Sequence, residues 1–133
     1  MIIVSKMTIA VGKKGVIESP SPAYEHYLTV FEDDGETGYF YAVDKADKDF
    51  MVDAMLIYNV EKVTDKNIPS EVAIGWSEDG LASLLLTNEY PHAIINFKNK
   101  KGYCRTGFPP PSNQLNWSNE GHGWKEGELT IFH

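Results

Sequence analysis

Cys104 is the residue of this sequence best suited to covalent chemistry, because a thiolate is a strong nucleophile when a base lies within reach. The candidate bases are His26, His92, His122 and His133. In the strand pairing predicted below, Cys104 lies opposite Asn96, and at ~3.3 Å per residue His92 is then about 13 Å away along the strands. His122 lies in a glycine-rich segment that could fold back onto Cys104, but nothing in the sequence requires it. We therefore expect a buried structural cysteine and no catalytic residue.

Metal and phosphate motifs are incomplete in this sequence. The histidines show neither an i, i+4 pair nor a Cys-x-x-Cys partner. Asp47 and Asp49 resemble part of a calcium loop, but the glycine and the glutamate that such a loop needs further on are missing. The glycine spacing of residues 75–80 matches a phosphate loop, but Leu81 follows where lysine is required. The sequence thus predicts no metal site and no cofactor.

The charge is strongly negative and unevenly distributed. The net charge is −7, and eight acids lie between residues 32 and 53 against only Lys45 and Lys48. Such a surface disfavours nucleic acid and anionic membranes as partners and attracts basic proteins. We expect Asp33, Asp34 and Glu36, in one predicted turn, to bind a basic protein partner or else to form a solvated acidic hairpin.

A second candidate surface begins at Arg105, which precedes Phe108 and three consecutive prolines. Arginine and tryptophan are favoured interface anchors, and polyproline segments are preorganised for docking. One interpretation makes Arg105, Phe108, Trp117 and Trp124 a recognition surface. In the other, Arg105 pairs with an acid of residues 32–53 and the prolines stiffen a crossing of the chain.

The elements that position these residues are predicted strands. Residues 71–77, 81–88, 92–98 and 103–106 alternate with turn sequences, and Asp79-Gly80 is a strong hairpin signal for a type I′ turn. This register pairs Trp76 with Ser83 and Ile74 with Leu85. It places Tyr103 on an apolar core face and Cys104 on the other face.

The second face has an apolar middle formed by Leu84, Leu86 and Ile94. Because apolar surface is costly to leave in water, another part of the chain or a ligand must cover it. These residues are therefore the candidate lining of a ligand pocket.

Elsewhere the pattern also favours strands. Residues 27–32 and 39–43 read as a hairpin, and residues 129–132 as a short final strand. Residues 51–60 fit one face of a helix or of a strand, and we favour strand because no helix N-cap precedes them. Residues 107–127 form a long loop. Met7 is an alternative start, which would make residues 1–6 dispensable.

These elements predict a mainly β protein with little helix. We expect one domain over residues 1–133, an antiparallel meander of roughly seven to nine strands forming a curved sheet, a small barrel or a sandwich. The single cysteine, the missing signal peptide and the lack of an apolar run of about 20 residues predict a cytoplasmic protein.

Three strings of the sequence resemble a small bacterial family known only as a domain of unknown function. They are residues 31–41 (FEDDGETGYFY), 76–80 (WSEDG) and 102–110 (GYCRTGFPP). The resemblance spans roughly residues 31–111 and implies a bacterial, cytoplasmic, single-domain protein. It brings no activity, cofactor or site.

Three functions follow from these observations, in order of preference. The first is a non-enzymatic interaction protein whose acidic face meets a basic protein, for example an immunity protein that neutralises a toxin. The second is a β-barrel that binds a small ligand. The third is a hydrolase or redox enzyme that depends on Cys104.

Overall fold

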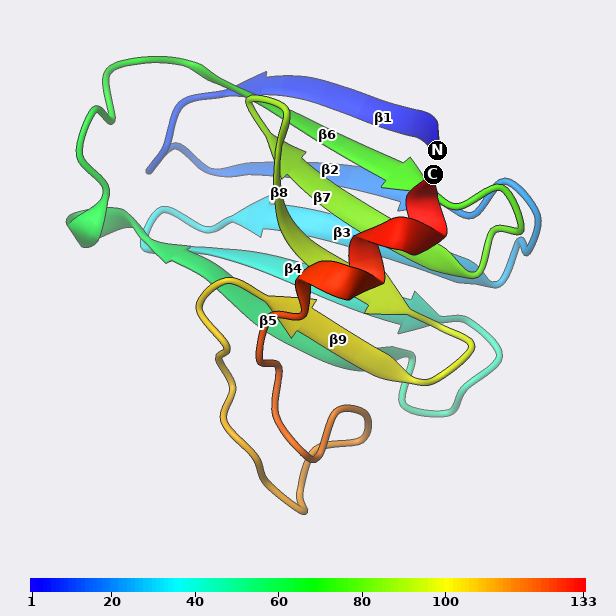
Figure 1. The fold of residues 1–133 in the computed structure, drawn as a ribbon. Coiled ribbons are helices and arrows are strands. Elements are labelled where there is room, and N and C mark those ends of the chain that lie inside the picture. Colours follow the sequence, from blue (N-terminus) through cyan, green and yellow to red (C-terminus); the bar gives the residue numbers. More distant parts are fainter.

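The computed structural model describes residues 1–133 and consists of two antiparallel sheets packed face to face (Figure 1). Sheet A has the order β1 (Ile2–Ile9), β6 (Ser70–Trp76), β7 (Ala82–Thr87), β8 (Tyr90–Asn96) and β9 (Lys101–Cys104). Sheet B has the order β2 (Gly15–Pro20), β3 (Tyr27–Asp33), β4 (Thr37–Asp44) and β5 (Met51–Asn59). Two 3₁₀ helices, η1 (Val60–Lys62) and η2 (Glu126–Phe132), complete the chain. The predicted mainly β, antiparallel fold is confirmed, and the arrangement is the sandwich.

The ambiguous segment at residues 51–60 is a strand, as predicted. β5 pairs with β4, and the pairing shifts register twice, so that Val52 and Asp53 are consecutive buried residues. Such bulges disturb the strict alternation of a strand. They explain why the apolar pattern of this segment also fits a helix.

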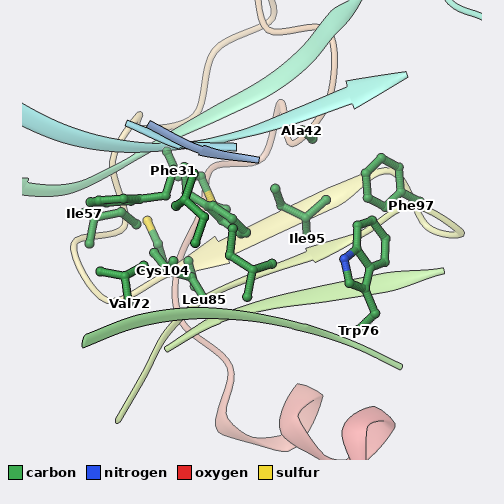
Figure 2. Packing of buried hydrophobic residues seen from close by; sticks show 14 of the residues in the cluster. Phe31, Ala42, Ile57, Val72, Trp76, Leu85, Ile95, Phe97 and Cys104 are labelled. Atoms are coloured by element: carbon green, nitrogen blue, oxygen red, sulfur yellow. The ribbon is translucent and has the colours of Figure 1, made fainter. Parts of the chain in front are cut away.

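The core lies between the sheets and is filled by 17 buried residues. Figure 2 shows Trp76 beside Phe97 at one end of this core and Cys104 near Val72 at the other. Two polar contacts join the sheets inside it. The Trp76 indole N–H donates to Ser19 Oγ (2.9 Å), and the hydroxyls of Thr29 and Ser83 lie 2.9 Å apart. Because buried polar groups are costly when unpaired, these contacts fix how one sheet sits on the other.

The register of β6 and β7 is confirmed, but the turn differs from the prediction. Trp76 pairs with Ser83 and Ile74 with Leu85. In the turn itself Gly80 has a positive φ of 73°, Asp79 does not, and Gly80 N–H donates to Ser77 O (2.9 Å). A type I′ turn needs two residues with positive φ, so the predicted turn type is wrong. The next turn has two such residues, at Asn88 and Glu89.

The predicted register of β8 and β9 is wrong by three residues, which exchanges the two faces of β9. Cys104 pairs with Ala93 rather than Asn96. The Asn96 side chain accepts a hydrogen bond from Asn99 N–H (3.0 Å), and Lys100 has a positive φ of 57°, so the turn begins earlier than its lysines and glycine suggest. As a result Cys104 faces the core and Tyr103 faces outward.

The outer face of sheet A is covered by η2, which crosses it in Figure 1. Residues 129–132 were predicted to be a strand, and this prediction is wrong. Leu129 and Phe132 are three residues apart, which puts them on one side of a 3₁₀ helix, and both pack over Leu84 and Ile94. The apolar middle of this face is thus covered largely by the chain itself.

Candidate functional site

Residues 107–125, here called the crossing segment, close the side of the sandwich where β5 and β9 end the two sheets (Figure 1). Leu56 N–H of β5 donates to Phe108 O (3.1 Å), and Thr106 Oγ1 donates to Leu56 O (2.6 Å). On the other sheet, Cys104 N–H donates to His122 O (2.9 Å). The long loop expected from the sequence is therefore bound to both sheets.

A buried polar cluster lies under the crossing segment. Its centre is Asp53 of β5, whose Oδ1 lies 2.7 Å from His122 Nε2 and whose Oδ2 accepts a hydrogen bond from Ser118 Oγ (2.7 Å). Ser118 Oγ in turn accepts from Gly102 N–H of β9 (2.7 Å). The His122 ring is completely buried, with 0% of its side chain exposed. Asp53 thus links β5, β9 and the crossing segment.

The residue types of this cluster are those of a serine hydrolase, but its hydrogen bonds are arranged differently. In a catalytic triad one histidine nitrogen faces the serine and the other faces the carboxylate. Here Ser118 binds Asp53, and the second ring nitrogen of His122, Nδ1, lies 2.8 Å from Pro109 O. Neither ring nitrogen is therefore free to take a proton from Ser118.

His122 is best described as a charged imidazolium. Both ring nitrogens face oxygen acceptors, and only the protonated ring donates from both. Burial opposes the charge, yet the hydrogen bonds to Asp53 and to Pro109 O raise the pKa of His122 above its ordinary value. From the sequence, the glycine-rich segment around His122 indicated only that this residue could fold back onto the sheet. No pattern predicted Asp53 as its partner.

Cys104 lies in surroundings that disfavour the thiolate. Its sulfur is buried, 3.4 Å from Thr106 Oγ1 and 3.6 Å from Phe108 O, and burial raises the pKa of the thiol. His92 lies at the bulge of β8 with its ring against Tyr90, 5.3 Å between centroids, outside the core. The two residues are thus separated by facing different sides of the sheet, and not by the distance along the strands that the sequence suggested.

We expect Cys104 to resist alkylation in the native protein. Iodoacetamide should modify it slowly under native conditions and fully in denaturant, since only unfolding exposes the sulfur. Mass spectrometry over a time course measures both rates. Rapid and complete labelling of the folded chain would contradict this prediction and favour a reactive cysteine.

Three of the four residues proposed for the second recognition surface pack against other side chains of the molecule, and one of these is buried. Trp117 is buried against Phe97, with ring centroids 5.4 Å apart, so its predicted exposure to a partner is wrong. The Arg105 guanidinium lies 4.0 Å from the Trp124 ring centroid and also contacts Tyr90.

The acid that pairs with Arg105 also differs from the one expected. Arg105 forms an ion pair with Glu126 of η2 (3.5 Å) and donates from Nε to Pro91 O (3.0 Å), so an ion pair with residues 32–53 is wrong. Trp124 Nε1 also donates to Glu126. Of the four predicted residues only Phe108 is exposed without such a stacking partner.

The acidic turn between β3 and β4 divides into a buried residue and two exposed ones. Asp33 is 1% exposed and accepts hydrogen bonds from Gly12 N–H (2.8 Å), Gly35 N–H (2.8 Å) and the Tyr58 hydroxyl (2.7 Å). Its predicted role on a partner surface is therefore wrong, because it anchors the turn from inside. Asp34 and Glu36 are exposed, as that surface requires.

The outward side of sheet B carries two rows of side chains that were not predicted as a surface from the sequence. Cross-strand pairing aligns Val16, Glu32, Tyr39 and Leu56 in one row, and Glu18, Val30, Tyr41 and Ala54 in the next. The Tyr39 and Tyr41 rings stack with centroids 6.1 Å apart, and Tyr41 donates to Glu32 (3.1 Å). Burial and this contact raise the pKa of Tyr41 to about 12.

These two rows are here called the tyrosine face. None of the four strands of sheet B contains lysine or arginine. In the sequence, the alternation of aromatic and acidic residues along the predicted hairpin is the pattern that could have indicated this face. The tyrosine face continues the exposed acids of the β3–β4 turn, so together they form an acidic surface with aromatic residues at its centre.

The candidate ligand-pocket residues separate in the structure. Ile94 is completely buried under η2, whereas Leu84 and Leu86 line an apolar groove of about 460 Å³ beside Leu129 and Phe132. The groove lies on the outer face of sheet A, and the space between the sheets is occupied by the core. The predicted barrel pocket is wrong, because the two sheets do not close into a barrel.

No cluster of three or more histidine, cysteine, aspartate or glutamate side chains is placed to hold a metal ion. None of the helices is long and apolar enough to span a bilayer.

Comparison with known proteins finds one family and one curated relative. A family model described as an uncharacterised protein conserved in bacteria (DUF2251) matches residues 9–133. An uncharacterised protein of Haemophilus influenzae is 40% identical over 101 residues, which are 75% of this chain and 63% of that protein. The match thus spans less than two thirds of the relative's length. No solved structure is detectably similar.

Proposed function

This chain belongs to the DUF2251 family of uncharacterised bacterial proteins, and we propose that it is a non-enzymatic binding protein. Its binding surface is the tyrosine face together with the exposed acids of the β3–β4 turn, and its partner is a basic protein. The observation that carries this proposal is the composition of sheet B. Its four strands hold no cation, and their outward rows combine glutamates with stacked tyrosines.

Electrostatics support a basic partner. Glu18 and Glu32 lie on the tyrosine face, and Asp34 and Glu36 extend the same negative charge beyond its edge. The strands of sheet B contribute no lysine or arginine, and Lys14 from the β1–β2 connection approaches only the turn, at Gly35. Such a field attracts cationic proteins and accelerates their association, especially at low salt.

The side chains of the face also suit tight contact. Tyrosine is enriched at interfaces because it offers a large apolar ring and a polar tip at low entropic cost. Val16 is 50% exposed and adds apolar area beside the tyrosine rows. A toxin-neutralising immunity protein is one concrete form of this function, since such a protein covers a charged surface of its target without chemistry.

A photocrosslinker at position 39 tests the proposal in bacterial cells. Replacing Tyr39 with p-benzoylphenylalanine should capture a partner with a basic isoelectric point, because this ring lies at the centre of the face. The same amino acid at Glu78, an exposed residue in the β6–β7 turn of sheet A, should not capture that partner. Mass spectrometry identifies the captured protein.

Charge reversal then measures the contribution of the acids. Glu18→Lys with Glu36→Lys should weaken binding of the purified partner by about tenfold or more in calorimetry. Glu78→Lys with Glu89→Lys produces the same net charge on the opposite sheet and should bind as the wild type does. Equal loss in both variants, or an acidic captured partner, would overturn the proposed function.

A further inference from the structure

A two-sheet sandwich has four edge strands, which here are β1 and β9 of sheet A and β2 and β5 of sheet B. An unprotected edge presents free backbone N–H and C=O groups that pair readily with another chain. Whether each edge of this molecule is protected therefore decides where the fold can add a strand.

Two of the four edges, β5 and β9, are held by the crossing segment, and a third, β2, is partly blocked. The crossing segment hydrogen-bonds Leu56 of β5 and Cys104 of β9. On β2, Glu18 O accepts from Ser5 Oγ (2.7 Å), and Pro20 has no N–H to offer. The β5 and β9 edges are therefore held by the chain, whereas β2 keeps the outward N–H groups of Val16 and Glu18 without a hydrogen bond.

The remaining edge, β1, is open. β1 pairs only with β6, and no backbone hydrogen bond outside that pairing reaches Ile2–Ile9. Its first residues are apolar and exposed: Ile2 is 40%, Ile3 44% and Val4 37% accessible to water. Figure 1 shows β1 along the upper border of sheet A with no element on its far side.

The register identifies which groups of β1 point outward. Ser77 N–H and Asn88 N–H bond across the β6–β7 pair to Ala82 and Glu71, so odd-numbered residues of β6 point to β7 and even-numbered ones to β1. Even-numbered Val72 of β6 pairs with Met7, whose N–H therefore faces β6. The neighbouring Lys6 and Thr8 must then direct their N–H groups to the free edge.

We propose that two copies of this chain associate through their β1 edges, as an antiparallel pair about a two-fold axis. The pair joins two copies of sheet A into one continuous sheet and satisfies the free backbone groups of residues 5–9, which follow the register shift between Ile3 and Ser5. It also removes the exposed apolar side chains of residues 2–4 from water. A second copy is always present at the concentration of the first, and it offers the same open edge.

Charge favours this edge over the rest of the surface for self-association. Each copy carries a net charge of −7, so contact between two tyrosine faces would bring glutamates together. β1 has no acidic residue. Its one charged residue, Lys6, is already paired with Glu71 of the same copy (3.5 Å). Two β1 edges can therefore meet without bringing like charges into close, unpaired contact.

Light scattering after size exclusion, over a range of protein concentrations, tests this inference. The wild type should form dimers, and Val4→Lys should weaken the dimer by about tenfold or more, because it adds a charge to the paired edge. Phe50→Lys is the control. It places the same charge on an exposed apolar residue just before β5 (52% exposed, against 37% for Val4), outside both the β1 edge and the tyrosine face, and should leave the dimer unchanged.

Amide hydrogen exchange locates the contact. The N–H groups of Lys6 and Thr8 should become protected as the concentration rises and the dimer forms, and Val4→Lys should abolish that protection. A monomer at every concentration would overturn the inference, as would a dimer in which these two amides still exchange freely. Either result leaves the tyrosine face untouched, because that face is tested by crosslinking and charge reversal on sheet B.

Discussion

His122→Ala should lower the free energy of unfolding by ~3–5 kcal/mol, because it removes one partner of a buried ion pair and leaves the other buried without its opposite charge. Asp53 would keep its bond from Ser118 but lose the one from the imidazolium, and Pro109 O would lose its donor. The crossing segment would also lose its link to β5 at this point. Urea denaturation of both proteins at one pH measures the difference.

The matched control for this substitution is His92→Ala. His92 lies at the bulge of β8, is half-buried and makes no side-chain hydrogen bond in the structure, so its removal should cost about 1 kcal/mol or less. Similar losses in the two variants would contradict the assignment of a special stabilising role to the Asp53–His122 pair.

The same pair should make stability depend on pH in a stated direction. The pKa of His122 is higher in the folded chain than its ordinary value, so the folded state binds the proton more tightly than the unfolded state. The stabilisation is therefore complete below about pH 6.5, and it is lost as the pH rises through the raised pKa. The difference in unfolding free energy between the wild type and His122→Gln should shrink over the interval above about pH 6.5. A difference that grows over this interval would contradict the imidazolium assignment.

Asp33→Ala should destabilise the protein by ~4–5 kcal/mol or more, since hydrogen bonds to a buried charged group contribute ~1.5–3 kcal/mol each and Asp33 accepts three. The substitution leaves the Tyr58 hydroxyl and two backbone N–H groups without their acceptor. It also frees the loop at Gly12, which Asp33 holds against the β3–β4 turn. Thermal and urea denaturation should agree on the loss.

Asp34→Ala is the control for Asp33→Ala. The two aspartates are adjacent and differ mainly in burial, so the difference between the two variants measures the effect of burying the carboxylate. Asp34 is exposed and accepts bonds from Glu36 N–H and Thr37 N–H within the turn. Its removal should cost much less stability than that of Asp33, because water replaces the lost contacts of an exposed carboxylate. If Asp33→Ala were as mild as Asp34→Ala, Asp33 would not anchor the turn from inside the molecule.

The contrast between Asp33 and Asp34 also limits how partner binding can be tested. A reversal that includes Asp33 would reduce binding by unfolding the turn, whatever the partner recognises. The substitutions at Glu18 and Glu36 avoid this, since their side chains lie on strands or turns without holding them together. The tyrosine face can thus be altered in charge while the fold is kept.

Much of the fold could be predicted because it depends on local rules. Alternation of side chains along a strand and the turn at Gly80 set the pairing of Trp76 with Ser83, although the turn itself is of another type. The predicted β8–β9 register was wrong because the Asn96 side chain accepts a hydrogen bond that starts the turn earlier. The resulting shift of three residues moves Cys104 from one face of the sheet to the other.

The candidate site could not be predicted to the same degree, because its residues meet across long stretches of chain. Asp53 and His122 are 69 residues apart, and no periodicity links them. Arg105 and Trp124 are residue types that favour a recognition surface, but in the structure the Arg105 guanidinium stacks on the Trp124 ring. An interface anchor and an internal anchor use the same chemistry, so residue type alone does not separate them.

By itself the sequence determined an antiparallel β protein with an acidic hairpin, since strand alternation, turn residues and net charge are local or additive properties. Only the tertiary structure decided which acids face water, which aromatic residues remain exposed and which sheet edge is open. Those properties depend on what packs against each residue from distant parts of the chain. Asp33 and Asp34 are identical and adjacent, and only the packing of Gly12 and Tyr58 against one of them makes it part of the interior.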